Sequence, residues 1–143
     1  MEKTMNYIEA MDFLEKTKKY GSQLGLTSIQ NLMQELSHVE EQLQIIHIAG
    51  TNGKGSVGAF LESVLMEAGY KVGRYTSPAV FDPLEVWRIN QKNIEKERYA
   101  ELFSKVKEAC DRMVGKGMPH PTIFEVETAM AFCYFKEECC DYV

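Results

Sequence analysis

Residues 44–68 read QIIHIAGTNGKGSVGAFLESVLMEA, and this stretch decides the fold of the chain. Its first part, Gln44–Ala49, is a short apolar run rich in β-branched isoleucine, which is typical of a buried strand. The middle part, Gly50–Ser56, holds three glycines, one lysine and two hydroxyl residues. From Val57 on, apolar residues recur at helical spacing until Gly69, which is a natural helix stop.

A strand, a glycine-rich turn and a helix in this order are the setting of a phosphate-binding loop. Glycines let backbone N–H groups turn inward, and the open N-terminus of the helix adds to the attraction for an anion. We expect these residues to bind the nucleotide phosphates: Gly50, Thr51, Asn52, Gly53, Lys54, Gly55 and Ser56. Lys54 is the candidate catalytic residue, because its mobile charge can reach the outer phosphates. The alternative is a plain strand-to-helix turn with a solvated lysine.

The loop is a shorter variant of the common pattern G-x-x-x-x-G-K-[ST]. Ile48 stands where the first glycine of that pattern would be, and Gly55 follows the lysine in place of a hydroxyl residue. The variant G-T-N-G-K-G-S at Gly50–Ser56 resembles the ATP loop of the Mur ligase superfamily, whose members join amino acids to carboxylates. The Gly55-Ser56 pair is similar to the folate branch of that superfamily, the folylpolyglutamate and dihydrofolate synthases.

Two further motifs carry the same resemblance. Tyr75–Pro78 resembles the Thr-Ser-Pro loop after the second strand, and Thr122–Ala129 resembles the family's Phe-Glu-x-x-Thr-Ala helix start. The resemblance implies that Ser77 and Glu125 hold Mg²⁺, and a hydroxyl with a carboxylate suits such a hard cation. Thr122 and Glu125 also fit a helix capping box, which is an alternative that coexists with the metal role.

The order of motifs predicts an α/β protein, a P-loop nucleotide-binding fold with a parallel sheet flanked by helices and incomplete at the C-terminus. Lys71–Thr76 is expected to be the second strand, and a strand-helix-strand unit implies a right-handed parallel crossover. Ligands in such sheets bind beyond the carboxyl ends of the strands. Asp141–Val143 is expected to begin a third strand. Residues 1–43 are expected to form a helical lead-in, and residues 44–143 the P-loop core portion.

The resemblance covers only the front of a family member, so a C-terminal domain is expected to be absent from these residues. It implies an ATP-dependent ligase that adds L-glutamate to the γ-carboxylate of folate or tetrahydrofolate through an acyl phosphate. The implied substrates are folate or dihydropteroate, L-glutamate and ATP. We expect this piece alone to bind nucleotide weakly without catalysis. Complete members are expected to be monomers, whereas an exposed sheet edge of the piece predicts self-association.

Three alternatives remain open at the level of sequence. The first is dihydrofolate synthase, or a bifunctional enzyme, which uses the same chemistry on dihydropteroate. The second is another Mur-type amino-acid ligase, against which Gly55 argues. The third is a P-loop binding module without ligase activity, although the guanine-reading run of GTPases is missing from the sequence.

Composition and charge limit the kinds of partner that the chain is expected to bind. The chain has 143 residues and a formal net charge of −5, which argues against a general nucleic-acid binder. No apolar run approaches the roughly 20 residues of a membrane span. The first residues lack the design of a signal peptide, so a cytoplasmic protein without membrane partners is expected. The four cysteines show no zinc-ligand spacing and are expected to be reduced structural thiols.

Overall fold

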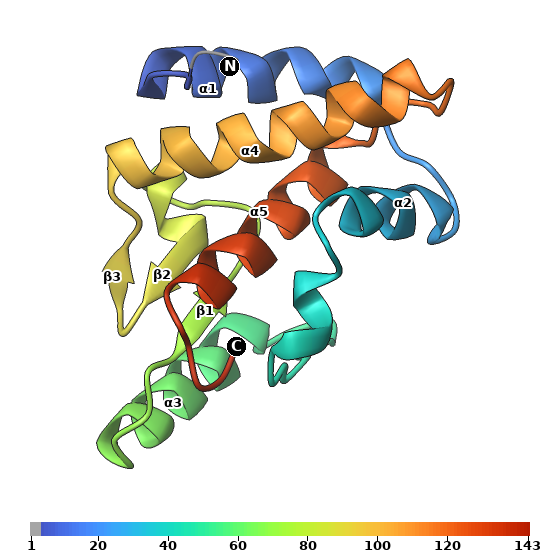
Figure 1. Ribbon diagram of the computed structural model, residues 1–143. Helices are drawn as coiled ribbons and strands as arrows, with labels where there is room; N and C mark the ends of the chain where they lie inside the picture. The colour runs from blue at the N-terminus through green and yellow to red at the C-terminus, as the bar shows by residue number, and fades with distance from the viewer. Residues whose placement is uncertain (1–3) are drawn as a thin grey trace. The chain divides into compact units, whose positions relative to one another are not determined.

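A computed structural model describes residues 4–143, which form two compact units (Figure 1). Unit 1 holds the described residues up to Glu41 together with Glu95–Tyr134. Unit 2 holds Gln42–Ile94 and Phe135–Val143. The domain division expected after residue 43 stays a prediction, because these units are groups of residues that contact one another and not segments of sequence.

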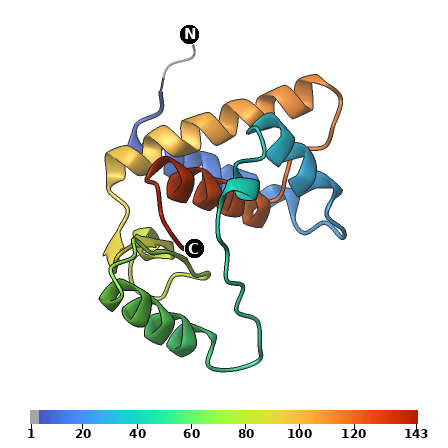
Figure 2. The ribbon, with the colours of Figure 1, turned by 60° about the horizontal axis from the view of Figure 1, so that its bottom comes forward.

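Unit 1 is helical. Its elements are α1 (Tyr7–Thr17), the short 3-10 helix η1 (Lys18–Tyr20), α2 (Thr27–Glu35), the part of η2 (Val39–Gln42) that ends at Glu41, α4 (Lys96–Gly115) and the part of α5 (Ile123–Glu137) that ends at Tyr134. Both α1 and α2 pack against α4, and α1 runs along it in both ribbon views (Figures 1 and 2). Fully buried apolar side chains line α4 on one side, among them Leu102, Phe103, Val106, Cys110 and Met113.

In the sequence, Asn6 followed by Glu9 three residues later predicts a helix N-cap at Asn6. The Asn6 side chain accepts a hydrogen bond of 3.0 Å from the Glu9 backbone N–H. The Glu9 carboxylate in turn accepts one of 2.7 Å from the Asn6 N–H. This reciprocal pair is a capping box, which satisfies two backbone donors at the start of the helix. The predicted cap at Asn6 is therefore confirmed.

Unit 2 combines a small sheet with one helix. Its elements are α3 (Lys54–Glu67), β1 (Gly73–Tyr75), η3 (Pro83–Val86), β2 (Trp87–Ile89) and β3 (Lys92–Asn93). The three strands form one sheet in the order β1-β2-β3, and both pairings are antiparallel. Arg74 of β1 lies opposite Arg88 of β2, which lies opposite Asn93 of β3. The strands lie beside α3 within this unit (Figure 2).

The expected parallel sheet flanked by helices is therefore wrong for the regular strands. The chain turns back after β1, so β2 pairs with it as an antiparallel neighbour and β3 follows through a two-residue loop. The expected strand Gln44–Ala49 has no regular strand assignment. What the structure supports is the coarser prediction, a chain that mixes helices with a sheet.

Parallel pairing does occur at the end of the chain. Tyr142 forms an isolated parallel bridge with Val72, and the Gly73 N–H donates to the Tyr142 carbonyl at 2.9 Å. On the other side of this segment, the Val143 N–H donates to the Gln44 carbonyl at 2.9 Å. The Ile46 N–H donates back to the Val143 carbonyl at 2.7 Å, which is the bonding pattern of parallel neighbours. The expected third strand is thus present as a short extended segment.

In the described part of the chain, no helix combines the length and the apolar character that crossing a membrane requires.

Candidate nucleotide site

The Gly50–Ser56 loop leads directly into α3. The helix begins at Lys54, three residues before the first apolar residue of the predicted helical run. Gly53 precedes it with a φ of 79°, a left-handed conformation that favours glycine. The first intrahelical bond runs from the Val57 N–H to the Gly53 carbonyl at 2.9 Å.

The N-terminus of α3 is open to a ligand. Gly53 has no side chain, and the structure shows no side-chain cap at this helix start. The N–H groups of the first turn have no partner within a helix, so they attract an anion along with the positive end of the helix dipole. Every residue from Gly50 to Ser56 is exposed. The loop is therefore exposed and leads into an uncapped helix N-terminus, and phosphate binding by it stays a prediction.

Lys54 is folded back onto this loop. Its Nζ donates a hydrogen bond of 2.7 Å to the Gly50 carbonyl, four residues earlier. The bond holds the ammonium group of Lys54 at the carbonyl of Gly50, where the loop begins. A lysine in this position is exposed and flexible, so it can turn toward a bound phosphate at little cost.

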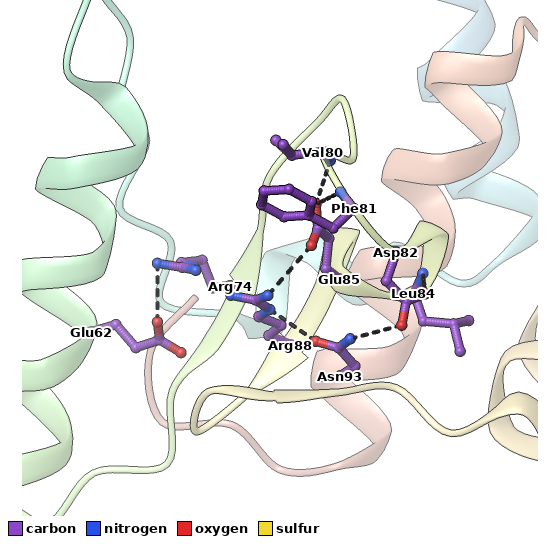
Figure 3. Close-up of polar contacts among 9 residues, drawn as sticks. All are labelled: Glu62, Arg74, Val80, Phe81, Asp82, Leu84, Glu85, Arg88 and Asn93. Carbon is purple, nitrogen blue, oxygen red and sulfur yellow. Dashed lines mark hydrogen bonds and ion pairs between the residues drawn. The ribbon is translucent and has the colours of Figure 1, made fainter.

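A second loop follows β1, from Ser77 to Asp82. The Thr76 N–H donates to the Val86 carbonyl at 3.1 Å, which closes the base of the loop. Ser77 is exposed. The Glu85 carboxylate folds under the loop and accepts hydrogen bonds from two of its backbone N–H groups, those of Val80 and Phe81, the latter at 3.0 Å (Figure 3).

These bonds favour the ionised form of the Glu85 carboxyl. The N–H groups of Val80 and Phe81 hold the pKa of that carboxyl below its ordinary value, against a smaller opposing effect of burial. The loop in return presents two apolar side chains to solvent, because Val80 is 76% and Phe81 is 93% exposed. The Glu85 carboxylate thus fixes the loop after Ser77 through bonds to its main chain.

Polar contacts continue from Glu85 into the sheet. Arg88 lies 3.7 Å from the Glu85 carboxylate, and its Nε donates to the Asn93 side chain at 2.9 Å (Figure 3). The Asn93 amide in turn lies 3.4 Å from Asp82, whose other oxygen caps η3 at the Leu84 N–H. The sequence did carry a sign of this arrangement, since Asp82-Pro83 is a helix-start pair. Sequence reasoning did not identify this signal.

In the sequence, the tryptophan at position 87 could either stack on a pterin or pack under the loop. Its side chain is 2% exposed and its ring is stacked on Tyr75 with centroids 6.3 Å apart. The packing interpretation is confirmed.

Glu125 is buried in unit 1 at the start of α5, where it forms the predicted capping box. Its Oε2 accepts hydrogen bonds from the Thr122 N–H at 2.8 Å and from the Thr122 hydroxyl at 3.0 Å. The Ser28 hydroxyl of α2 donates to the same oxygen at 3.0 Å. All three donors reach Oε2, and none of these bonds involves the second oxygen of the carboxylate.

The structure therefore brings together part of the expected site. The seven loop residues are contiguous at the start of α3, and Ser77 follows a strand of the same unit. Glu125 belongs to unit 1. A shared metal site of Ser77 and Glu125 stays a prediction.

Known proteins resemble this chain in sequence and in backbone fold. No family model matches the chain. The dihydrofolate synthase/folylpolyglutamate synthase of Bacillus subtilis is 38% identical over 131 residues, which are 92% of this chain and 30% of that protein. The chain is related to the folylpolyglutamate and dihydrofolate synthases. It spans between 15% and 31% of the length of the curated relatives compared with it, and 31% of the Thermotoga maritima structure.

Solved structures of folylpolyglutamate synthases agree with the relationship in fold. The enzyme of Thermotoga maritima matches with a TM-score of 0.86 and 33% identity, over 95% of this chain and 31% of its own. A folylpolyglutamate synthase in complex with AMPPCP and folate matches with a TM-score of 0.86 and 30% identity, over 96% of this chain and 34% of its own. Nearly the whole chain thus has the backbone of a folylpolyglutamate synthase segment.

Proposed function

We propose that this chain is the ATP-binding portion of a ligase that adds L-glutamate to the γ-carboxylate of folate or tetrahydrofolate. The observation that carries the proposal is the exposed Gly50–Ser56 loop, which enters α3 through a left-handed Gly53 and leaves the helix N-terminus uncapped. The relationship to folylpolyglutamate synthases supports it, since one such enzyme has a complex with an ATP analogue and folate.

The chemistry requires that a carboxylate be activated. A folate carboxylate oxygen attacks the γ-phosphorus of ATP, which forms an acyl phosphate and releases ADP. The glutamate amine then attacks the acyl carbon, and an amide forms as phosphate leaves and the amine loses a proton. The protein contributes positioning and neutralisation of charge. The loop N–H groups hold the phosphates, Lys54 offsets their charge, and the polar side chains of Thr51, Asn52 and Ser56 orient oxygens.

The residues present also fit Mg²⁺. The metal would screen the charge between the two reacting anions, as in other phosphoryl transfers. Ser77 and Glu125 would hold it with one hydroxyl and one carboxylate oxygen, the ligand types that this cation prefers. The capping box at Glu125 permits this role, because its three donors reach only one of the two carboxylate oxygens.

A lysine substitution tests the proposal. Lys54→Ala should weaken ATP binding by about 10- to 100-fold, because a charge-assisted hydrogen bond contributes on the order of 1.5–3 kcal/mol. Isothermal titration of the 143-residue chain with ATP and Mg²⁺ measures this directly. Lys92→Ala removes another exposed lysine of unit 2 and should leave ATP binding unchanged. Equal affinities of the Lys54 variant and the unchanged chain would contradict the role given to Lys54.

The ligase chemistry is tested with a protein of the relatives' full length. The isolated chain should bind ATP without ligating glutamate, and glutamate ligation by these residues alone would contradict that expectation. Comparison of dihydropteroate with a reduced folate as acceptor separates dihydrofolate synthase, or a bifunctional enzyme, from folylpolyglutamate synthase. The name of the Bacillus subtilis relative includes both activities, which keeps this second candidate open. Turnover of a UDP-linked substrate would indicate another Mur-type ligase, and ATP binding without any ligation would indicate a binding module.

A further inference from the structure

Helix α3 buries one residue, and that residue is an acid. Within α3, all of which the structure describes, only Glu62 is buried, with 2% of its surface exposed. The apolar residues Val57, Phe60 and Val64 are 53%, 75% and 65% exposed. An ordinary amphipathic helix buries its apolar side and exposes its charges. The most buried contact between α3 and the rest of unit 2 is therefore made by a charged side chain.

Glu62 connects α3 to two separate parts of the sheet. Its Oε2 lies 3.2 Å from Nη1 of Arg74, which projects from β1 (Figure 3). Its Oε1 accepts a hydrogen bond of 3.0 Å from the N–H of Gln91, in the loop between β2 and β3. The Gln91 side chain returns to the helix and donates to the Ser63 hydroxyl at 3.2 Å. Consecutive helix residues are thus tied to β1 and to the β2–β3 loop.

The ion pair is poorly suited to a purely stabilising role. Glu62 Oε2 and Arg74 Nε are buried without a hydrogen-bond partner among the described residues, although the two side chains lie at ion-pair distance. Removing two charges from water costs free energy, which the attraction recovers only when the hydrogen bonds are well formed. A buried ion pair that lacks these hydrogen bonds is weak evidence that the pair stabilises the folded chain.

The backbone beneath Gln91 is also held in an unfavourable conformation. Asn90 and Gln91 both have positive φ, 47° and 66°, as the central residues of a two-residue loop. This conformation is unfavourable for a residue with a long side chain. Two hydrogen bonds to Val72 hold Asn90 in place, from its N–H to the Val72 carbonyl and from the Val72 N–H to its side chain, each at 2.9 Å. The loop is therefore fixed so that the Gln91 N–H points at Glu62.

We propose that Glu62 and Arg74 are positioning residues, which set the phosphate loop at the start of α3 relative to Ser77 at the end of β1. The inference rests on the proposed function. Glu62 follows Lys54 by eight residues of helix, about 12 Å. Arg74 lies in β1 and Ser77 follows three residues later, so at most about 10 Å of chain separates them. The ion pair joins the two elements that carry the phosphate loop and the expected metal ligand.

The test separates positioning from folding by removing both charges. The double variant Glu62→Gln/Arg74→Gln keeps polar side chains at both positions and leaves no buried charge unpaired, so it should remain folded. The readout is the Mg²⁺ concentration that gives half-maximal ATP binding, measured by titration of the chain beside ATP binding with a chelator present. We expect the Mg²⁺ requirement to rise by about 10- to 100-fold, the usual effect of removing a partner that supports a metal ligand. ATP binding in chelator should stay unchanged.

Further variants make the outcomes distinct. Arg74→Lys keeps the charge and should retain most of the Mg²⁺ response, whereas Glu62→Gln alone should lose it. Lys92→Ala is the matched surface control. An unchanged Mg²⁺ requirement in the double variant would overturn the positioning role while the proposed function stands. An equal loss of ATP binding with and without Mg²⁺ would overturn it in favour of a structural role. Absence of ATP binding by the unchanged chain would overturn both.

Discussion

A Cβ atom at Gly73 would lie 2.4 Å from Cδ1 of Phe135, closer than real contacts of this kind. Phe135 is fully buried, and its ring also meets the added atom at Cγ and Cε1. Because the whole ring edge is in the way and an aromatic ring cannot bend, Gly73→Ala should force β1 and α5 to shift. We expect a loss of about 1–3 kcal/mol in the free energy of unfolding, measured by urea denaturation.

Gly58→Ala is the matched control for that substitution. A Cβ atom at Gly58 would meet Arg74 Cδ and Ile48 Cδ1 at 3.8 Å, an ordinary van der Waals distance. Gly58 lies inside α3, where alanine is favoured over glycine by about 1 kcal/mol. This variant should therefore be as stable as the unchanged chain or more stable. Similar losses in both glycine variants would show that the Phe135 ring is not the cause.

The contribution of the α5 cap to the free energy of unfolding should be measurable. Thr122→Ala removes the hydroxyl that donates to Glu125 and that also lies 3.4 Å from the Glu125 N–H. Loss of such a cap typically costs about 1 kcal/mol of stability. Thermal or urea unfolding followed by circular dichroism gives the value, and Thr122→Ser should restore most of it because the hydroxyl is kept. A Thr122→Ser variant as unstable as Thr122→Ala would argue against the hydrogen bonds.

The loop after Ser77 should loosen in acid. The N–H groups of Val80 and Phe81 lower the pKa of Glu85 in the folded chain, whereas the unfolded carboxyl titrates near about 4.3. The contribution of Glu85 is therefore fully present above the unfolded pKa and is lost as pH falls through the lower, folded pKa. Hydrogen exchange of the Val80 and Phe81 amides, expressed as protection factors, should report this loss. In Glu85→Gln the pH dependence should disappear, and a protection that stays constant into acid in the unchanged chain would refute the link.

Removal of Mg²⁺ should weaken ATP binding, and Ser77 should carry part of that effect. In the unchanged chain, a chelator should lower ATP affinity, because the metal neutralises the phosphates. In Ser77→Ala the affinity should already be lower, and the chelator should reduce it by a smaller factor than in the unchanged chain. Ser22→Ala, at an exposed serine of unit 1, serves as the control. A full chelator effect in Ser77→Ala would remove Ser77 from the metal site.

Local signals in the sequence predicted most of the helices. Caps and helical spacing are set by residues three or four positions apart, so Asn6 and Thr122 identified the starts of α1 and α5. The phosphate loop was recognisable for the same reason, because all its residues lie within one short segment.

Pairing between distant segments was harder to predict. The segment Gln44–Ile46 pairs with Val143, far along the chain, and no local pattern in the sequence predicts this pairing. The β2–β3 loop carries Asn-Gln instead of the Asn-Gly that marks such turns. The role of Glu62 was missed because its partners, Arg74 and the Gln91 N–H, lie far along the chain. The role of Glu85 was missed because its main partners are backbone amides, which residue spacing does not reveal.

The backbone conformation and the contacts of the loop between β2 and β3 limit which residues can replace Gln91. The main chain there favours glycine, while the link to Ser63 favours a long amide side chain. Glycine would relieve the backbone but lose the link, and most other residues would lose the link and keep the strain. In a saturation library selected for function, this solvent-facing position should therefore accept about as few replacements as a site in the protein interior.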